Sequence, residues 1–286
     1  MVKTDAYAEE LEQLVWDPSS AERLAARLKE QSNLPGPRAN LALVEAFADA
    51  VSTEAAEPAA WLETLYAWAA MSVEEAPEGD PAVFLPVCAV VALGVLFHTH
   101  ACAYPCTGPC DCPLWPIQAE HLVEAIRRAA SDSRWRVREA AAMALQHLGE
   151  GNPESLRRIL DGWLEDDSLL ERRAALAALA HPPLLQDKRM ARHALKIADR
   201  IFQDAAKVAP EQRKSEDFRV LKKGLSYAPS VLAAHLPKEG FALLERLADS
   251  ADADIRKMVA ANLKKKRLQA VDSKRAAGIL KAATGV

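Results

Sequence analysis

The sequence lacks three kinds of pattern, those of β-strands, of a secretory leader and of common catalytic motifs. No stretch alternates apolar and polar residues with a period of two, so no β-sheet is expected. Acidic residues such as Asp5, Glu9 and Glu10 lie where a secretory leader would be basic and then apolar. No Gly-rich phosphate loop, Gly-x-Ser-x-Gly elbow or His-Glu-x-x-His motif occurs. We therefore expect a cytoplasmic protein without these common catalytic sites.

Aromatic residues are sparse, and one long segment carries no charge. Phe, Trp and Tyr make up 6% of the 286 residues, while alanine is plentiful, a balance that suits closely packed helices. No formally charged residue occurs between Asp80 and Asp111. The apolar run 81–97 is slightly short for a membrane span and is broken by Pro86. We therefore expect a buried helix there and no membrane contact.

Charge is distributed unevenly along the chain. Residues 1–130 carry 7 Lys and Arg against 19 Asp and Glu, whereas residues 131–286 carry 29 against 21. The first part is therefore net −12 and the second net +8, within an overall charge of −4. This asymmetry predicts an anion-facing C-terminal half. The alternative is that the two parts present differently solvated faces.

A helical phrase recurs in the C-terminal half. One copy is DSRWRVREAAAMAL at 132–145, and further copies are ERRAALAAL at 171–179 and DIRKMVAANL at 254–263. A weaker fourth copy lies at 218–220. Aligned on the arginine that each contains, the copies follow one another at intervals of 34, 47 and 37 residues, the spacing of helical hairpins. One such hairpin cannot bury its apolar stripe alone, so neighbours must stack.

The recurring phrase resembles HEAT repeats. We therefore predict an all-α fold, an α-solenoid of HEAT-like helical hairpins with an irregular Cys-rich loop inserted near 98–116. The expected organisation is an acidic helical region over 1–97, the Cys-rich loop over 98–116, and HEAT-like repeats over 117–286. Helical periodicity and capping signals predict helices near 5–15, 21–31, 117–130, 133–148, 152–165, 168–181, 188–206, 215–228, 231–235, 239–249, 252–264 and 272–283.

Candidate metal ligands gather in the Cys-rich loop. Four soft thiolates at this spacing suit a tetrahedral zinc, and a site closed by protein ligands would be structural. An iron–sulfur cluster and free or redox-active thiols are the alternatives, whereas disulfides are disfavoured in a chain that is kept reduced. Cys88 lies apart in the apolar run and is expected to be inert core. The candidate ligands are Cys102, Cys106, Cys110 and Cys112, with His98 and His100 as additional candidates.

An ordered series of aromatic and charged residues follows. Trp135 and Glu139 are four apart on one predicted helix, so their side chains share a face. Arg173 ends a Gly-Trp-Leu-Glu-Asp-Asp-Ser-Leu-Leu-Glu-Arg-Arg phrase, and Tyr227 ends Lys-Gly-Leu-Ser-Tyr. Over residues 117–245 these phrases are similar to the HEAT-like-repeat DNA glycosylases of bacterial alkylation repair, the AlkD-like family. The alternative is that Trp135 packs on the preceding helix and Glu139 is a solvated surface residue.

That resemblance implies a monofunctional DNA glycosylase that excises N3- or N7-alkylated purines. Glu139 stands where the family has aspartate, and Tyr227 stands where it has tryptophan. The carboxylate would stabilise the oxocarbenium character of the sugar. The rings of Trp135 and Tyr227 would favour a cationic nucleotide by cation–π contact. Arg173 would hold a phosphate by charge-assisted hydrogen bonds.

The basic residues of the C-terminal half extend this hypothesis. Lysine and arginine can follow a DNA backbone without reading bases. We therefore predict a DNA-binding solenoid with duplex DNA as its partner, either an alkylpurine glycosylase or a catalytically silent relative. One alternative is a protein-binding scaffold without enzymatic activity, which holds a protein or peptide in its concave groove. Another is a metal- or redox-sensing module. The predicted DNA contacts are Arg172, Arg173, Lys222, Lys223, Lys264, Lys265, Lys266 and Arg267.

Overall fold

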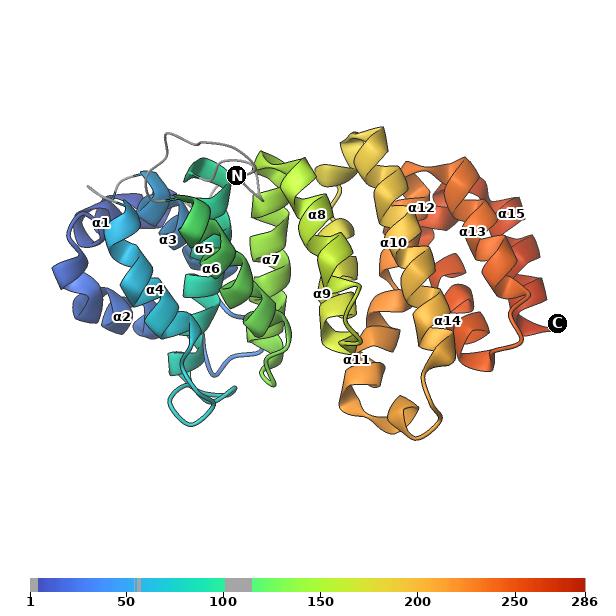
Figure 1. The fold of residues 1–286 in the computed structure, drawn as a ribbon, viewed down its shortest axis with the longest axis horizontal. Helices are drawn as coiled ribbons and strands as arrows, with labels where there is room; N and C mark the ends of the chain where they lie inside the picture. Colours follow the sequence, from blue (N-terminus) through green and yellow to red (C-terminus); the bar gives the residue numbers. More distant parts are fainter. Residues whose placement is uncertain (1–4, 54, 56–57, 101–114, 286) are drawn as a thin grey trace. The chain divides into compact units, whose positions relative to one another are not determined.

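The computed structural model is an all-α protein. It describes residues 5–53, 55, 58–100 and 115–285, and these contain helices and no strand. The predicted fold class, an α-solenoid of helical hairpins, is confirmed. The chain forms two compact units, Met1–Leu156 and Arg157–Val286 (Figure 1).

The first unit is organised around α5 (Phe84–His100), which packs on α2, α3, α4, α6 and α7. This helix is apolar on all sides, which is the pattern of a helix buried on all sides. Burial also raises the pKa of the Cys88 thiol well above its usual value, as suits the predicted inert core. The other helices of the unit are α1 (Asp5–Val15), α2 (Ala21–Glu30), α3 (Leu41–Thr53), α4 (Leu62–Ala69), α6 (Trp115–Ala130) and α7 (Trp135–Gly151).

The expectation that Pro86 breaks the apolar run is wrong. Pro86 is the third residue of α5, where a backbone N–H has no partner inside the helix, so proline is tolerated there. The segment Pro81–Thr99 is long and apolar enough to cross a membrane by length and composition alone, but 83% of its most apolar window is buried inside the protein. The predicted buried helix is confirmed.

Helices α5 and α7 meet at backbone contact. A Cβ on Gly94 would overlap the backbone of Ala144 on α7. Four alanines of α7 are buried, and their small side chains allow this close approach. They are Ala140, Ala141, Ala142 and Ala144. Because α5 precedes the Cys-rich loop and α7 follows it, this contact places both in one unit. The two compact units divide between Leu156 and Arg157.

The second unit has two layers of helices. In one layer α9 packs on α11 and α11 packs on α14, while in the other α10 packs on α13 and α13 packs on α15. Helix α10 also contacts α9, α12 and α14, which joins the layers. The helices are α8 (Pro153–Trp163, whose first turn ends the first unit), α9 (Leu169–Leu179), α10 (Lys188–Lys207), α11 (Glu216–Leu225), α12 (Ala228–His235), α13 (Pro237–Ala248), α14 (Ala253–Leu263) and α15 (Lys266–Thr284).

The predicted helices are confirmed to within a few residues, with one exception. Helix α15 begins at Lys266, whereas the sequence predicted a helix only from 272. It bends at Asp272, whose φ and ψ are −157° and 92°. The Asp272 carboxylate accepts a hydrogen bond from the Arg275 backbone N–H at 2.9 Å, so the residue acts as an internal cap.

The repeat arginine has one structural role in three of its four copies. Nη1 of Arg138, Arg172 and Arg256 each donates to the carbonyl oxygen six residues earlier, and all three distances are 2.6 Å. Each arginine therefore ties its helix to the loop that precedes it. Arg219, in the weaker fourth copy, is 65% exposed and pairs with Glu216 on its own helix.

Candidate nucleic-acid interface

Trp135 begins α7 in the first unit and is 46% exposed. The guanidinium carbon of Arg136 lies 4.4 Å from the centre of its ring, within range of a cation–π contact. Arg136 pairs with the Glu78 carboxylate and donates to the Gly36 carbonyl at 3.1 Å. Glu139, one turn further along α7, is exposed. The two residues are thus solvent-accessible on one helix, and a cation already covers one face of the ring.

A buried arginine fixes the start of α7. Arg134 is 4% exposed and pairs with Asp132 at 2.6 Å. Its guanidinium donates to the carbonyl oxygens of Met71 at 2.8 Å, Ser72 at 3.1 Å and Ala76 at 3.0 Å. The loop 71–76 therefore holds the residue that precedes Trp135, and the direction of Trp135 is set by packing outside its own helix.

Tyr227 lies in the second unit, immediately before α12, and is 49% exposed. Two cations face its ring, since Arg267 Cζ is 4.6 Å and Lys265 Nζ is 5.4 Å from the ring centre. Arg267 Nη2 also donates to the Tyr227 hydroxyl at 2.9 Å. The aromatic ring and the two cations form one continuous group.

Arg173 lies beside the turn that precedes Tyr227. Its Cγ lies 3.6 Å from the point where a Cβ on Gly224 would be, an ordinary van der Waals distance, so the arginine stem lies beside Gly224. The Gly224 carbonyl accepts the Tyr227 backbone N–H at 3.0 Å. We call Arg173, Tyr227, Lys265 and Arg267 the Tyr227 surface. The structure thus places the stem of Arg173 beside Gly224, three residues before Tyr227, in the second unit, and Trp135 and Glu139 one turn apart on α7 in the first.

A fully buried asparagine supports the Tyr227 turn. Asn262 donates from Nδ2 to the carbonyls of Leu225 at 2.7 Å and Met258 at 2.8 Å. Its Oδ1 accepts the Ser230 backbone N–H at 2.8 Å. Because one side chain links α14 with both sides of the turn, the backbone of Tyr227 has little freedom to move.

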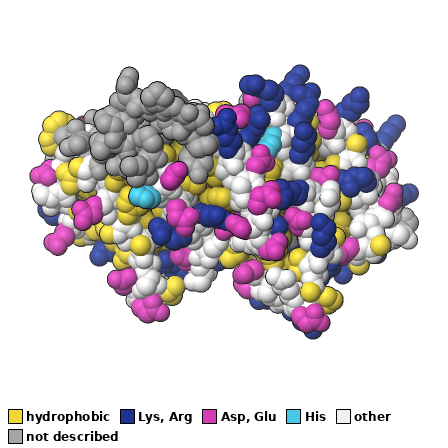
Figure 2. All heavy atoms as spheres, viewed as in Figure 1, with side chains coloured by type: hydrophobic (Ala, Val, Ile, Leu, Met, Phe, Trp, Pro, Cys, Tyr) yellow, Lys and Arg dark blue, Asp and Glu magenta, His cyan; other side chains and the backbone are white. Residues whose placement is uncertain are grey.

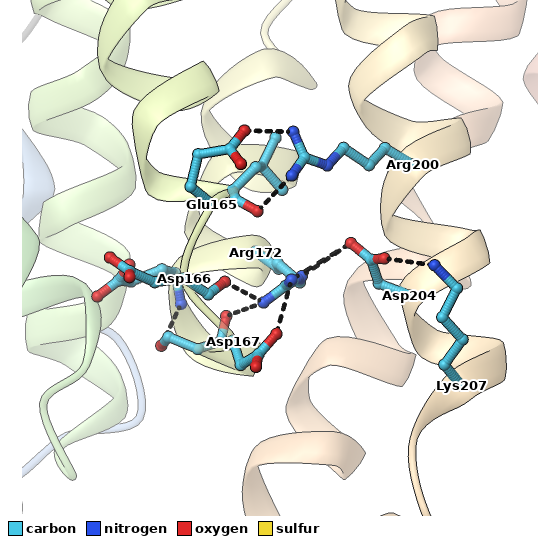
Figure 3. A network of polar contacts seen from close by, with 10 residues as sticks. Glu165, Asp166, Asp167, Arg172, Arg200, Asp204 and Lys207 are labelled. Atoms are coloured by element: carbon cyan, nitrogen blue, oxygen red, sulfur yellow. Dashed lines mark hydrogen bonds and ion pairs between the residues drawn. The ribbon is translucent and has the colours of Figure 1, made fainter.

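Two of the predicted DNA contacts are engaged elsewhere. Arg172 is 5% exposed, pairs with Asp204 at 3.3 Å and donates to the Asp166 carbonyl, in the network of Figure 3. Its guanidinium cannot reach a phosphate without breaking these contacts. Lys222 Nζ lies 2.5 Å from Asp254 Oδ1, which neutralises its charge. The predicted contacts Lys223, Lys264 and Lys266 are exposed.

The predicted metal ligands are mostly outside the described residues. Cys102, Cys106, Cys110 and Cys112 lie there, and the side chain of His100 is also not described. His98 is exposed on α5, with Nδ1 2.9 Å from the His147 carbonyl oxygen. Over the ranges that the structure describes, no group of three or more His, Cys, Asp or Glu side chains is gathered as a metal site.

Comparison with known families identifies the repeats. Residues 114–180 match the family model for HEAT repeats. This segment of the chain therefore consists of HEAT repeats. The match covers α6, α7, α8 and α9, including the arginines Arg138 and Arg172 that hold their loops. Its helical hairpins form a repeat scaffold.

One solved structure is distantly similar to this chain. It is a crystal structure of an engineered protein from the Northeast Structural Genomics Consortium, 17% identical in sequence. The alignment covers 96% of this chain and 97% of that chain, with a TM-score of 0.36. No curated protein matches the sequence significantly.

Proposed function

We propose that this protein binds the phosphate backbone of duplex DNA through the Tyr227 surface. The observation that carries the proposal is the half-exposed Tyr227 ring with Arg267 and Lys265 against it, and with Arg173 beside Gly224 in the preceding turn. Guanidinium groups bind phosphate oxygens through charge-assisted, often bidentate hydrogen bonds. A ring that holds two cations in fixed positions reduces the entropy they lose on binding.

The charge of the second unit supports this proposal. Residues 157–286 carry 26 Lys and Arg against 17 Asp and Glu, a net charge of +9, whereas residues 1–156 carry 10 against 23, a net charge of −13. A strongly basic unit attracts nucleic acid over a distance of about 8–10 Å at ordinary salt. The exposed Lys223, Lys264 and Lys266 would add phosphate contacts at the edge of the Tyr227 surface.

A glycosylase activity is a second candidate, and one observation favours it. Trp135 and Glu139 are exposed one turn apart on α7, which is the arrangement that the family resemblance requires. The cations on the rings weigh against it, because Arg136 and Arg267 occupy positions where a cationic purine would make its cation–π contact. The contacts therefore favour binding of the DNA backbone over excision of an alkylated base.

The decisive experiment is duplex DNA binding by the full chain across a salt series from about 50 to about 200 mM. We expect affinity to fall steeply with salt, and the double variant Lys265→Gln/Arg267→Gln to bind more weakly with a log–log slope reduced by about two. Lys274→Gln/Lys281→Gln, which removes the same charge from exposed sites on α15, is the control and should leave the slope almost unchanged. Absence of binding at the lowest salt would instead favour the protein-binding scaffold.

The glycosylase candidate needs a separate assay. Release of N7-methylguanine from an alkylated duplex would be measured for the unaltered chain and for Glu139→Gln. Removing an electrostatic stabiliser of this kind lowers the rate by about 10²–10³. If the unaltered chain binds DNA and releases no base, the protein is a non-catalytic DNA-binding scaffold.

A further inference from the structure

A cavity in the second unit is lined only by basic side chains. It lies between α8 and α10 and has a volume of about 270 Å³. Figure 2 shows dark-blue side chains gathered over α8 and the N-terminal half of α10. Arginine and lysine keep their charge at neutral pH, so the cavity holds four permanent positive charges. Its lining residues are Arg157 from α8 and Arg189, Arg192, His193 and Lys196 from α10.

The period of the helix creates this cluster. The four α10 residues stand at positions i, i+3, i+4 and i+7, so they share one side of the helix. Met190, Ala194 and Ile201 of α10 are buried on the side that faces the core of the unit. The basic side chains therefore face solvent and the neighbouring α8. No run of lysines marks the cluster in the sequence, because apolar residues separate its members and Arg157 comes from another helix.

The start of α10 is also an unfavourable place for cations. The N-terminus of a helix carries partial positive charge, so acidic residues are preferred in its first turn. Helices α9, α11 and α14 follow this rule with Glu171, Glu216 and Asp254. Helix α10 has an acidic N-cap, Asp187, which accepts the Arg189 backbone N–H at 2.8 Å, but its first turn contains no acidic residue and begins Lys188-Arg189. An anion in the cavity would relieve both the repulsion among the cations and their conflict with the helix dipole.

Three carboxylates that stand near these cations make long contacts with them. Charge-assisted hydrogen bonds between nitrogen and oxygen are usually about 2.7–2.9 Å. Longer contacts between exposed groups contribute little free energy, so the charges of Arg189 and Arg192 stay largely unneutralised. The contacts are His193 to Asp161 at 3.5 Å, Arg189 to Asp187 at 3.7 Å and Arg192 to Glu239 at 3.8 Å.

We propose that this cavity binds a compact polyphosphate anion, a chain of two or three linked phosphates that is free or ends a nucleotide. Guanidinium forks match the oxygens of phosphate bidentately, and the ammonium of Lys196 adds a compact charge. A water molecule occupies about 30 Å³ in the liquid, so the cavity has room for several groups of that size. The site lies on α8 and α10, whereas the Tyr227 surface is built from α9, α15 and the turn before α12. The proposal is therefore independent of DNA binding.

The test is calorimetric titration of the full chain with sodium tripolyphosphate at low salt. We expect one saturable site in the unaltered chain, and at least about tenfold weaker binding by Arg192→Gln/Lys196→Gln, because two charge-assisted contacts are removed. Lys274→Gln/Lys281→Gln removes the same net charge and should bind like the unaltered chain. Equal weakening in both double variants, or no saturable binding by the unaltered chain, would overturn the proposal.

Two further measurements distinguish a polyphosphate site from a loss of folding and from a DNA contact. Tripolyphosphate should raise the thermal midpoint of the unaltered chain and not that of Arg192→Gln/Lys196→Gln, while the helical spectra of both remain alike. Lys265→Gln/Arg267→Gln should keep tripolyphosphate binding even if it loses duplex DNA. If Arg192→Gln/Lys196→Gln instead loses duplex DNA and tripolyphosphate shows no saturable site, the cavity is a DNA contact and the proposal is wrong.

Discussion

Single arginines hold this protein together at its loops. In three repeats the arginine at the fourth helical position donates to the carbonyl six residues earlier, which joins a helix to its incoming loop. The loop between α10 and α11 uses a different residue, since Arg213 donates from Nε to the Val208 carbonyl at 2.9 Å and pairs with Asp252 at 2.6 Å. Arg219 faces solvent, so the arginine that holds this loop is Arg213, which lies outside the repeat phrase.

This difference predicts opposite outcomes for equivalent positions. Arg172→Ala should lower the free energy of unfolding by about 2–3 kcal/mol, because it leaves the Asp204 carboxylate and the Asp166 carbonyl without their buried donor. Arg219→Ala should change it by less than about 0.5 kcal/mol, since only an exposed pair with Glu216 is lost. Urea unfolding followed by circular dichroism measures both. Equal losses in the two variants would show that the position of the arginine in its helix, not its burial, determines how much it contributes to the free energy of unfolding.

The sequence predicted which residues of the candidate site are aromatic or charged, but not which of them touch. The spacing of Trp135 and Glu139 placed them on one helix face, and the structure places both in solvent. The cations against the rings were not predictable, because Arg136 is positioned by Glu78 and Gly36, which lie far away in sequence. Local periodicity carries no information about such loop contacts.

At the scale of elements, the contact between α5 and α7 is a close backbone approach within the first unit. Gly94→Ala should destabilise the protein by about 1–3 kcal/mol, because the added methyl overlaps the Ala144 backbone and the helices must separate. Gly278→Ala is the matched control, since a Cβ there meets open space on α15. That change should stabilise the protein by about 0.5–1 kcal/mol through helix propensity. Chemical unfolding of both variants tests whether the two changes in the free energy of unfolding have opposite signs.

A histidine links α3 with α7 and makes stability depend on pH. Burial alone would lower the pKa of His147, but its 2.8 Å hydrogen bond to Glu45 and the charges of Glu45, Glu150 and Asp49 outweigh burial and raise the pKa. A raised pKa in the folded state means that the stabilisation is complete below about 6.5, the unfolded value. It is lost as the pH rises through the folded value.

We therefore expect the unfolding free energy of the unaltered chain to fall as the pH rises above about 6.5, and to fall by more than that of His147→Gln. Glu45→Gln removes the carboxylate that raises the pKa of His147, so it should flatten the same part of the profile. Denaturant midpoints of the three proteins at each pH give the comparison. Parallel profiles for all three would mean that His147 does not titrate differently on folding.

The positions of the helices were largely predictable, whereas their packing partners were not. Capping signals such as Asn152 before Pro153 gave helix boundaries, and the Ser155 backbone N–H does bond to the Asn152 side chain at 3.0 Å. The division of the chain depends instead on the contact between α5 and α7, which crosses the Cys-rich loop. A glycine at a helix crossing looks the same in sequence as an exposed glycine, so Gly94 gave no signal.

At the scale of the whole molecule, the charge asymmetry follows the two compact units. The first is net −13 and the second +9, so the change of sign seen along the sequence coincides with a division in the fold. Both proposed anion-binding surfaces belong to the second unit. The acidic first unit would repel DNA and small polyanions alike, which confines such ligands to the basic unit.

Two compact units also predict two unfolding transitions, because each unit has its own buried core. Five of the six tryptophans lie in residues 1–156, so fluorescence reports mainly on the first unit, whereas circular dichroism reports on the helices of both. Gly94→Ala should shift the fluorescence transition. Asn262→Ala, which removes three buried hydrogen bonds and costs about 2–3 kcal/mol, should shift only part of the dichroism curve. If both variants moved both curves equally, the chain would unfold as one cooperative solenoid in which stacking between repeats outweighs the division into units.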